Sequence, residues 1–110
     1  MLAPIELIPV NSDKVISGVI SNISASGVGI IIKEPIEINS SVMINFELPG
    51  EKKFKNIQGD IIRSEGVGDK YFAHVGVNFS NLKPDIRDEI NKFVADFKYK
   101  QYQMNTWSMY

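Results

Sequence analysis

Alternation of apolar and polar residues in two short segments is the feature that most constrains the fold of this chain. Every second residue is apolar from Ser41 to Leu48, and the same holds from Tyr71 to Phe79. A period of two places such residues on one face of a strand. Both segments therefore predict strands of a sheet with one buried face. The residues on that face are Val42, Ile44, Phe46, Leu48, Ala73, Val75, Val77 and Phe79.

Four further segments in the first 80 residues favour strands. Residues 5–9, 15–23, 28–32 and 53–63 are rich in β-branched and other apolar side chains, which is typical of strands. Gly18 lies inside one of these segments. A glycine within a strand indicates a bulge or sharp coiling of the chain.

A helical pattern begins at residue 84. Pro84 suits the first turn of a helix, and Asp85 favours its positive N-terminal end. One apolar stripe follows, made of Ile86, Ile90, Phe93, Val94 and Phe97, at helical spacing. Strands followed by one helix predict a mainly β chain, a six- to seven-stranded antiparallel β-barrel of the split-barrel type with a C-terminal α-helix.

Length and composition restrict the class of protein. The chain has 110 residues, enough for one domain and too few for two. We expect the barrel at 4–80, the helix at 84–100 and an aromatic tail at 101–110. The net charge of −1 provides no general basic field for a nucleic acid polymer.

Compartment and membrane topology are also restricted by composition. The chain contains no cysteine, so it has no disulfide framework, which fits a reducing cytoplasm. No apolar run approaches the roughly 18 residues that a membrane span requires. We therefore expect a cytoplasmic protein without membrane insertion.

The segment Asn22-Ile23-Ser24-Ala25-Ser26-Gly27 joins two of the predicted strands. It resembles the Asp/Asn-x-Ser-x-x-Gly signature of PilZ domains, small β-barrels best known as receptors for cyclic di-GMP. The order of elements over residues 4–97 resembles the same family. The segments that carry this resemblance include Phe46-Glu47-Leu48-Pro49, residues 57–63, His74-Val75-Gly76-Val77-Asn78-Phe79 and the helix from Asp85.

The resemblance implies a ligand site on the outer face of the barrel, completed by the segment before the first strand. By position in the motif, Asn22 and Ser24 would hydrogen-bond the guanine and phosphate region, and Gly27 would make the turn. Residues two apart on a strand share a face, an asparagine amide suits a guanine edge, and glycine adopts positive φ and admits a close ligand. The alternative is that these residues only maintain the turn.

The other half of the family signature, an Arg-x-x-x-Arg pattern ahead of the first strand, is missing from this sequence. Either the native polypeptide begins further upstream, or the chain is a family member without that half of the site. Arg63 and Arg87 lie far apart in the sequence, and Lys14, Lys33 and Lys70 lack the planar fork of a guanidinium. None of these residues is predicted to replace the missing pair.

Catalytic and metal chemistry find little support in the sequence. Ser24 has only a distant histidine as a base, and the acids around Asp85 suit the N-terminus of the predicted helix. One histidine and no cysteine provide no metal site. We expect His74 to be a half-buried surface residue beside Phe72, with a proton switch or a ligand contact as the alternative.

Aromatic and methionine residues are concentrated at the C-terminus. When exposed, such a cluster is typical of an interface with a partner. The alternative is that the tail folds back onto the barrel as a last layer of the core. The candidate interface residues are Tyr99, Tyr102, Met104, Trp107 and Tyr110.

These features together predict a non-catalytic bacterial signalling module without a cofactor. It would be a PilZ-like receptor or adaptor for cyclic di-GMP in the control of motility, adhesion or exopolysaccharide, with a protein partner or a second copy. The alternative is a PilZ-like domain without a nucleotide site, acting through protein contacts alone, for example in type IV pilus assembly. A third option is a subdomain whose partner domain holds the missing arginines.

Overall fold

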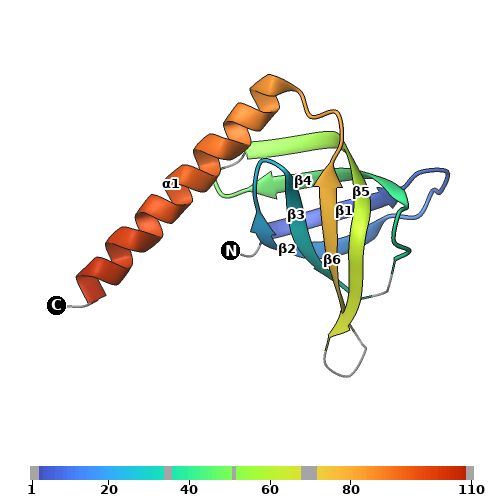
Figure 1. Ribbon diagram of the computed structural model, residues 1–110, viewed down its shortest axis with the longest axis horizontal. Coiled ribbons are helices and arrows are strands. Elements are labelled where there is room, and N and C mark those ends of the chain that lie inside the picture. The colour runs from blue at the N-terminus through green and yellow to red at the C-terminus, as the bar shows by residue number, and fades with distance from the viewer. Residues whose placement is uncertain (1–2, 34–35, 51, 68–71, 109–110) are drawn as a thin grey trace.

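The computed structural model describes the backbone of residues 3–33, 36–50, 52–67 and 72–108, and the side chains of these residues except 67 and 100–108. Within this part of the chain, six strands precede one helix (Figure 1). The elements are β1 (Ala3–Pro9), β2 (Ile16–Ile23), β3 (Gly27–Ile32), β4 (Ser41–Leu48), β5 (Lys52–Val67), β6 (Phe72–Phe79) and α1 (Pro84–Ser108).

The six strands form one closed antiparallel barrel. Their order around it is β1-β2-β3-β6-β5-β4, and pairing of β1 with β4 completes the circle. The closing ladder runs from Ile5 opposite Phe46 to Pro9 opposite Val42. Because closure pairs the strands on both sides, it removes the open edges of the sheet. The predicted fold class, an antiparallel barrel with a C-terminal helix, is confirmed.

The core follows from the period of two. On β4 and β6 the predicted inward positions are buried, each at most 4% exposed except for Phe79, which is partly buried against the core. β1 contributes Ala3, Ile5 and Leu7 in the same alternation. No polar side chain is buried in the described part of the chain. The barrel interior is therefore an apolar core.

Gly18 serves close packing between strands. A Cβ at this position would lie 2.6 Å from Cγ2 of Ile32 and 2.7 Å from the carbonyl oxygen of Ile31, both on β3. The pairing of Gly18 with both neighbouring strands is regular. The predicted bulge exists in β2, but its extra residue is Ser21.

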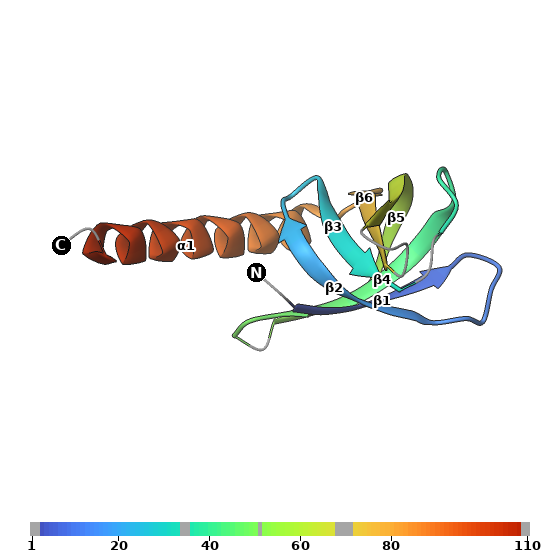
Figure 2. The same cartoon turned by 90° about the horizontal axis from the view of Figure 1, so that it is seen from below.

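The first half of α1 packs on the barrel. Ile90 is fully buried in the core, and Ile86, Phe93 and Val94 are partly buried against it. The helix passes the expected end near residue 100 and reaches Ser108, with no glycine or proline to interrupt it. Its second half runs away from the barrel in both views (Figures 1 and 2). Within the described residues, no helix is apolar over a sufficient length to span a membrane.

Replacing Ile90 by Ala tests this docking of the helix. The side chain is fully buried, so its truncation should lower the free energy of unfolding by about 2–5 kcal/mol. Urea denaturation followed by circular dichroism measures the change. Asn91→Ala, at the exposed neighbouring position, is the matched control and should stay within about 0.5 kcal/mol of the parent. Equal stability of both variants would contradict the packing of α1 on the core.

Candidate functional site

The signature segment forms the hairpin turn between β2 and β3. The backbone N–H of Ser24 donates to the carbonyl oxygen of Gly27 at 2.9 Å, and Phe79 of β6 donates to the carbonyl of Ser26 at 2.9 Å. The Ser26 N–H also donates to Oγ of Ser24 at 3.3 Å, and the two hydroxyl oxygens are 2.9 Å apart. A hydroxyl has one donor and two acceptor sites. Ser24 therefore serves the turn and keeps capacity for one further hydrogen bond.

Gly27 is required by packing between strands. A Cβ at this position would collide with the backbone carbonyl of Val77 on β6. Among the glycines that the structure describes, Gly50 alone has a positive φ. The expectation that Gly27 supplies a positive φ is therefore wrong. The turn itself is made as expected, and the missing side chain lets β3 and β6 approach.

A β-bulge turns Asn22 to the outer face of the barrel. The ladder between β2 and β3 shifts at Ser21, between the pairs of Ile20 and Asn22. Ile20 is fully buried, so strict alternation would aim Asn22 inward, and the extra residue reverses this direction. Asn22 is exposed, and its amide lies over Gly29, where a Cβ would come within 2.6 Å of Oδ1.

A second bulge does the same for Arg63 on β5. The ladder between β5 and β6 shifts at Ile62, so that Ile61 faces Val77 and Arg63 faces Gly76. Ile61 is fully buried, whereas Arg63 is exposed. A Cβ added to Gly76 would lie 3.4 Å from Cβ and 3.6 Å from Nε of Arg63. The arginine side chain therefore leans over this glycine.

The two bulges face each other across a pair of glycines. Gly29 of β3 and Gly76 of β6 are cross-strand partners, and we call them the glycine floor. Asn22 pairs with Gly29 on one side, and Arg63 pairs with Gly76 on the other. Three strand spacings of about 4.8 Å put the Cα atoms of Asn22 and Arg63 about 14 Å apart. The floor is thus bordered by an amide and a guanidinium that both lean towards it.

His74 lies on the same outer face. Its Nε2 is 3.3 Å from Oγ of Ser21, the extra residue of the first bulge, and this hydrogen bond spans β3. The side chain is half-buried and Phe72 is exposed, so the expected surface position is confirmed. His74 therefore fixes Ser21 beside Asn22, which steadies one border of the glycine floor.

Three residues of this face, Gly29, Gly76 and Arg63, were not predicted as site residues from the sequence. A signal for both glycines was present, because a glycine inside a strand indicates close approach of another group. No comparable signal marked Arg63, since its direction depends on a bulge. Lys70 lies outside the described residues, and Lys14 and Lys33 are exposed.

The predicted interface residues lie at the far end of α1. Tyr99 is 63% exposed. Tyr102, Met104 and Trp107 belong to the part of the helix whose side chains are not described, and Tyr110 lies outside the described residues. Their role stays a prediction.

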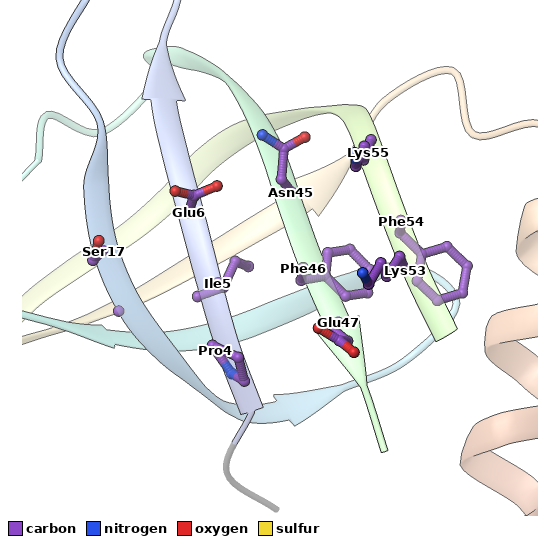
Figure 3. A pocket seen from close by; sticks show the side chains of 11 residues that line it. Pro4, Ile5, Glu6, Ser17, Asn45, Phe46, Glu47, Lys53, Phe54 and Lys55 are labelled. Atoms are coloured by element: carbon purple, nitrogen blue, oxygen red, sulfur yellow. The ribbon is translucent and has the colours of Figure 1, made fainter. Parts of the chain in front are cut away.

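Two hollows in the described surface lie away from the signature segment. One of about 390 Å³ crosses β2, β1, β4 and β5, where Glu6, Asn45 and Lys55 lie over neighbouring strands (Figure 3). Oδ1 of Asn45 accepts the N–H of Asn56 at 2.8 Å and so fills the bulge of β5. Another hollow, of about 430 Å³, lies between β4, β5 and the start of α1. The glycine floor lies outside both hollows, and its two glycines are buried beneath neighbouring side chains.

The outer face of the barrel offers hydrogen-bonding groups rather than a cluster of metal ligands in the described part of the chain. Across the described ranges, no three His, Asp or Glu side chains are grouped to hold an ion. The outer face instead offers amide, hydroxyl, imidazole and guanidinium groups, which form hydrogen bonds to purines and phosphates.

Comparison with known proteins supports the barrel fold. The family model described as PilZ domain matches residues 1–96. YcgR from Escherichia coli in complex with cyclic di-GMP is 9% identical with a TM-score of 0.82, covering 97% of this chain and 46% of that one. The Bacillus subtilis inhibitor of motility MotI/DgrA is 12% identical with a TM-score of 0.77, covering 91% of this chain and 48% of that one.

A solved PilZ domain alone is also similar. The PilZ domain of YcgR from Escherichia coli with cyclic di-GMP is 9% identical with a TM-score of 0.72, covering 96% of this chain and 88% of that one. The chain thus spans about half of the first two proteins. No curated protein matches the sequence. At these identities the likeness demonstrates the fold.

Replacing Gly27 by Ala tests the packing role of this glycine. The new methyl group would collide with the Val77 carbonyl, and such overpacking costs about 1–3 kcal/mol of unfolding free energy. Gly66→Ala is the matched control, because its Cβ would meet no atom within 4 Å. Chemical denaturation of both variants measures the difference. A Gly27→Ala variant as stable as Gly66→Ala would show that β3 and β6 do not approach as described.

Proposed function

The chain belongs to the PilZ domain family, and we propose that it is a non-catalytic signalling module whose barrel binds cyclic di-GMP on its outer face. YcgR from Escherichia coli, of the same fold, carries this nucleotide in two solved structures. The observation that carries the proposal is the amide of Asn22, turned outward by a bulge and held over Gly29.

Asn22 has the chemistry to bind a guanine. Its amide offers two donors and one acceptor, and a guanine edge presents complementary groups. In the described part of the chain the side chain of Asn22 has no hydrogen-bond partner, so its capacity is available to a ligand. Ser24, two residues on, adds a hydroxyl with capacity for one more bond.

The glycine floor suits the flat base of such a nucleotide. Gly29 and Gly76 lie side by side and carry no side chains of their own, so the space above them is taken by the amide of Asn22 and by the side chains of Ile62 and Arg63. A base laid there would displace these exposed side chains and could then approach the backbone closely, which glycine permits. Hydrogen bonds from the flanking side chains then orient the base.

The proposed biological role is control of bacterial motility, adhesion or exopolysaccharide in the cytoplasm. MotI/DgrA, of the same fold, is an inhibitor of motility. Binding would act by changing the surface that the barrel offers to a partner protein. The ligand can shift such an equilibrium only by its difference in affinity for the two states.

Titration of cyclic di-GMP into the full chain tests the proposal. We expect saturable binding by isothermal calorimetry, and Asn22→Ala should weaken it about five- to 150-fold, because a lost hydrogen bond costs about 1–3 kcal/mol. Asn91→Ala on α1 is the control and should bind as the parent does. Both variants should keep the parent melting temperature. Absence of binding by the parent, or equal binding by Asn22→Ala, would contradict the proposed site.

A second candidate function is self-association through the end of α1. The helix leaves the barrel in both views (Figures 1 and 2), and Tyr99 is 63% exposed. Positions 97, 104 and 107 follow at intervals of seven and three residues, the spacing of a helix seam. They continue the stripe of Ile90 and Phe93 beyond the packed half of the helix. A second copy of the chain would supply a matching seam.

Removal of residues 99–110 should reduce the association state, because it deletes seam positions 104 and 107 while leaving Ile86 to Val94 on the barrel. Sedimentation velocity of the full and shortened chains measures the change. Trp107→Ala should weaken association, and Thr106→Ala is the matched control. A monomer before and after truncation would refute self-association.

A further inference from the structure

We propose that Arg63 is the cationic contact of the candidate site and that its guanidinium binds the phosphodiester of a cyclic dinucleotide laid across the glycine floor. This inference rests on the proposed function and adds a residue outside the signature segment. It assigns the phosphate to β5 and the base to β2, on opposite borders of the floor.

The direction of Arg63 is set by the bulge at Ile62. Ile61 is fully buried opposite Val77, so regular alternation would aim Arg63 into the core. The extra residue reverses the phase of the strand, as Ser21 does for Asn22. Two independent bulges therefore aim two polar side chains at one pair of glycines.

The space over Gly76 allows the arginine to reach the floor. Its stem passes 3.4 Å, and its Nε 3.6 Å, from where a Cβ of this residue would lie. Gly76 is buried although it faces outward, because the side chains of Ile62 and Arg63 cover it. A ligand on the floor would therefore contact the guanidinium directly.

The guanidinium is available for a ligand. Among the described residues, Arg63 has no hydrogen-bond or ion-pair partner. Asp60, on the same strand, instead accepts a hydrogen bond from Ser41 of β4 at 3.1 Å. Arg87, the other arginine of the sequence, stands in the first turns of α1. A planar guanidinium binds a phosphate through two parallel hydrogen bonds, so Arg63 is suited to this contact.

Calorimetric titration of cyclic di-GMP into Arg63 variants of the full chain tests the inference. Arg63→Met keeps the apolar stem and removes the charge, and it should weaken binding at least tenfold. Arg63→Lys keeps the charge without the fork and should lie between Met and the parent. Arg87→Ala is the control and should bind as the parent does. Thermal melts should be equal for all four proteins.

The salt dependence of binding separates a charge contact from a packing effect. Affinity of the parent should fall as sodium chloride rises, because salt screens the attraction between guanidinium and phosphate. Arg63→Met should have a flatter dependence. An unchanged dependence with weakened binding would overturn the phosphate contact.

Gly76→Ala tests the floor itself. The added methyl group would meet Arg63 at ordinary contact distances of 3.4 and 3.6 Å, so the fold should tolerate it. It would nevertheless raise the surface beneath the ligand, and we expect at least tenfold weaker binding at an unchanged melting temperature. Unchanged affinity would overturn the placement of the ligand on the floor.

The outcomes for the inference and for the proposed function are distinguishable. One outcome is that the parent binds cyclic di-GMP and that Asn22→Ala weakens binding whereas Arg63→Met does not. In that case the inference on Arg63 is wrong and the proposed function stands. If the parent does not bind cyclic di-GMP, both are wrong. Weakening by Arg63→Met and by Asn22→Ala, with Arg87→Ala unchanged, supports both.

Discussion

Pairing of β1 with β4 turns a curved sheet into a closed barrel, and the direction of every strand's side chains follows from that closure. Each strand then has one apolar face inside and one face outside, so alternation along the chain becomes obligatory. The interior is filled by aliphatic and phenylalanine side chains, and α1 adds Ile90 to it. A chain with its interior filled can bind a ligand only on its outer surface.

The outer surface acquires its binding groups where alternation is interrupted. Ser21 and Ile62 are extra residues in two strands that flank the same pair of strands. Each bulge aims a polar side chain outward, and each faces a glycine that leaves room for it. Bulges of this kind re-aim side chains near functional sites. Each bulge interrupts the regular hydrogen bonds of its ladder. Because of the two bulges, Asn22 and Arg63 lie on the same outer surface.

Much of the fold follows from the sequence, because period-two segments and a helical stripe are local patterns. The inward faces of β4 and β6 and the packed stripe of α1 were predictable in this way. The direction of Arg63 was not, since a bulge depends on the register between strands distant in sequence. For the same reason, the role of Gly27 was predicted wrongly as a positive φ. The glycine is required by packing against the carbonyl of Val77, which lies fifty residues away in the sequence. The signature segment pointed to Asn22 and Ser24, whereas the glycine floor emerged only when the strands were placed side by side.

Mapping of cyclic di-GMP onto the barrel by two-dimensional NMR is the most direct test of the central claim, that the nucleotide binds across the glycine floor. The account predicts that titration shifts the backbone amide signals of Asn22, Gly29, Arg63 and Gly76, with the far side of the barrel unchanged. Shifts confined to the hollow around Glu6 and Asn45 (Figure 3) would contradict it. An unchanged spectrum at saturating nucleotide would contradict it as well.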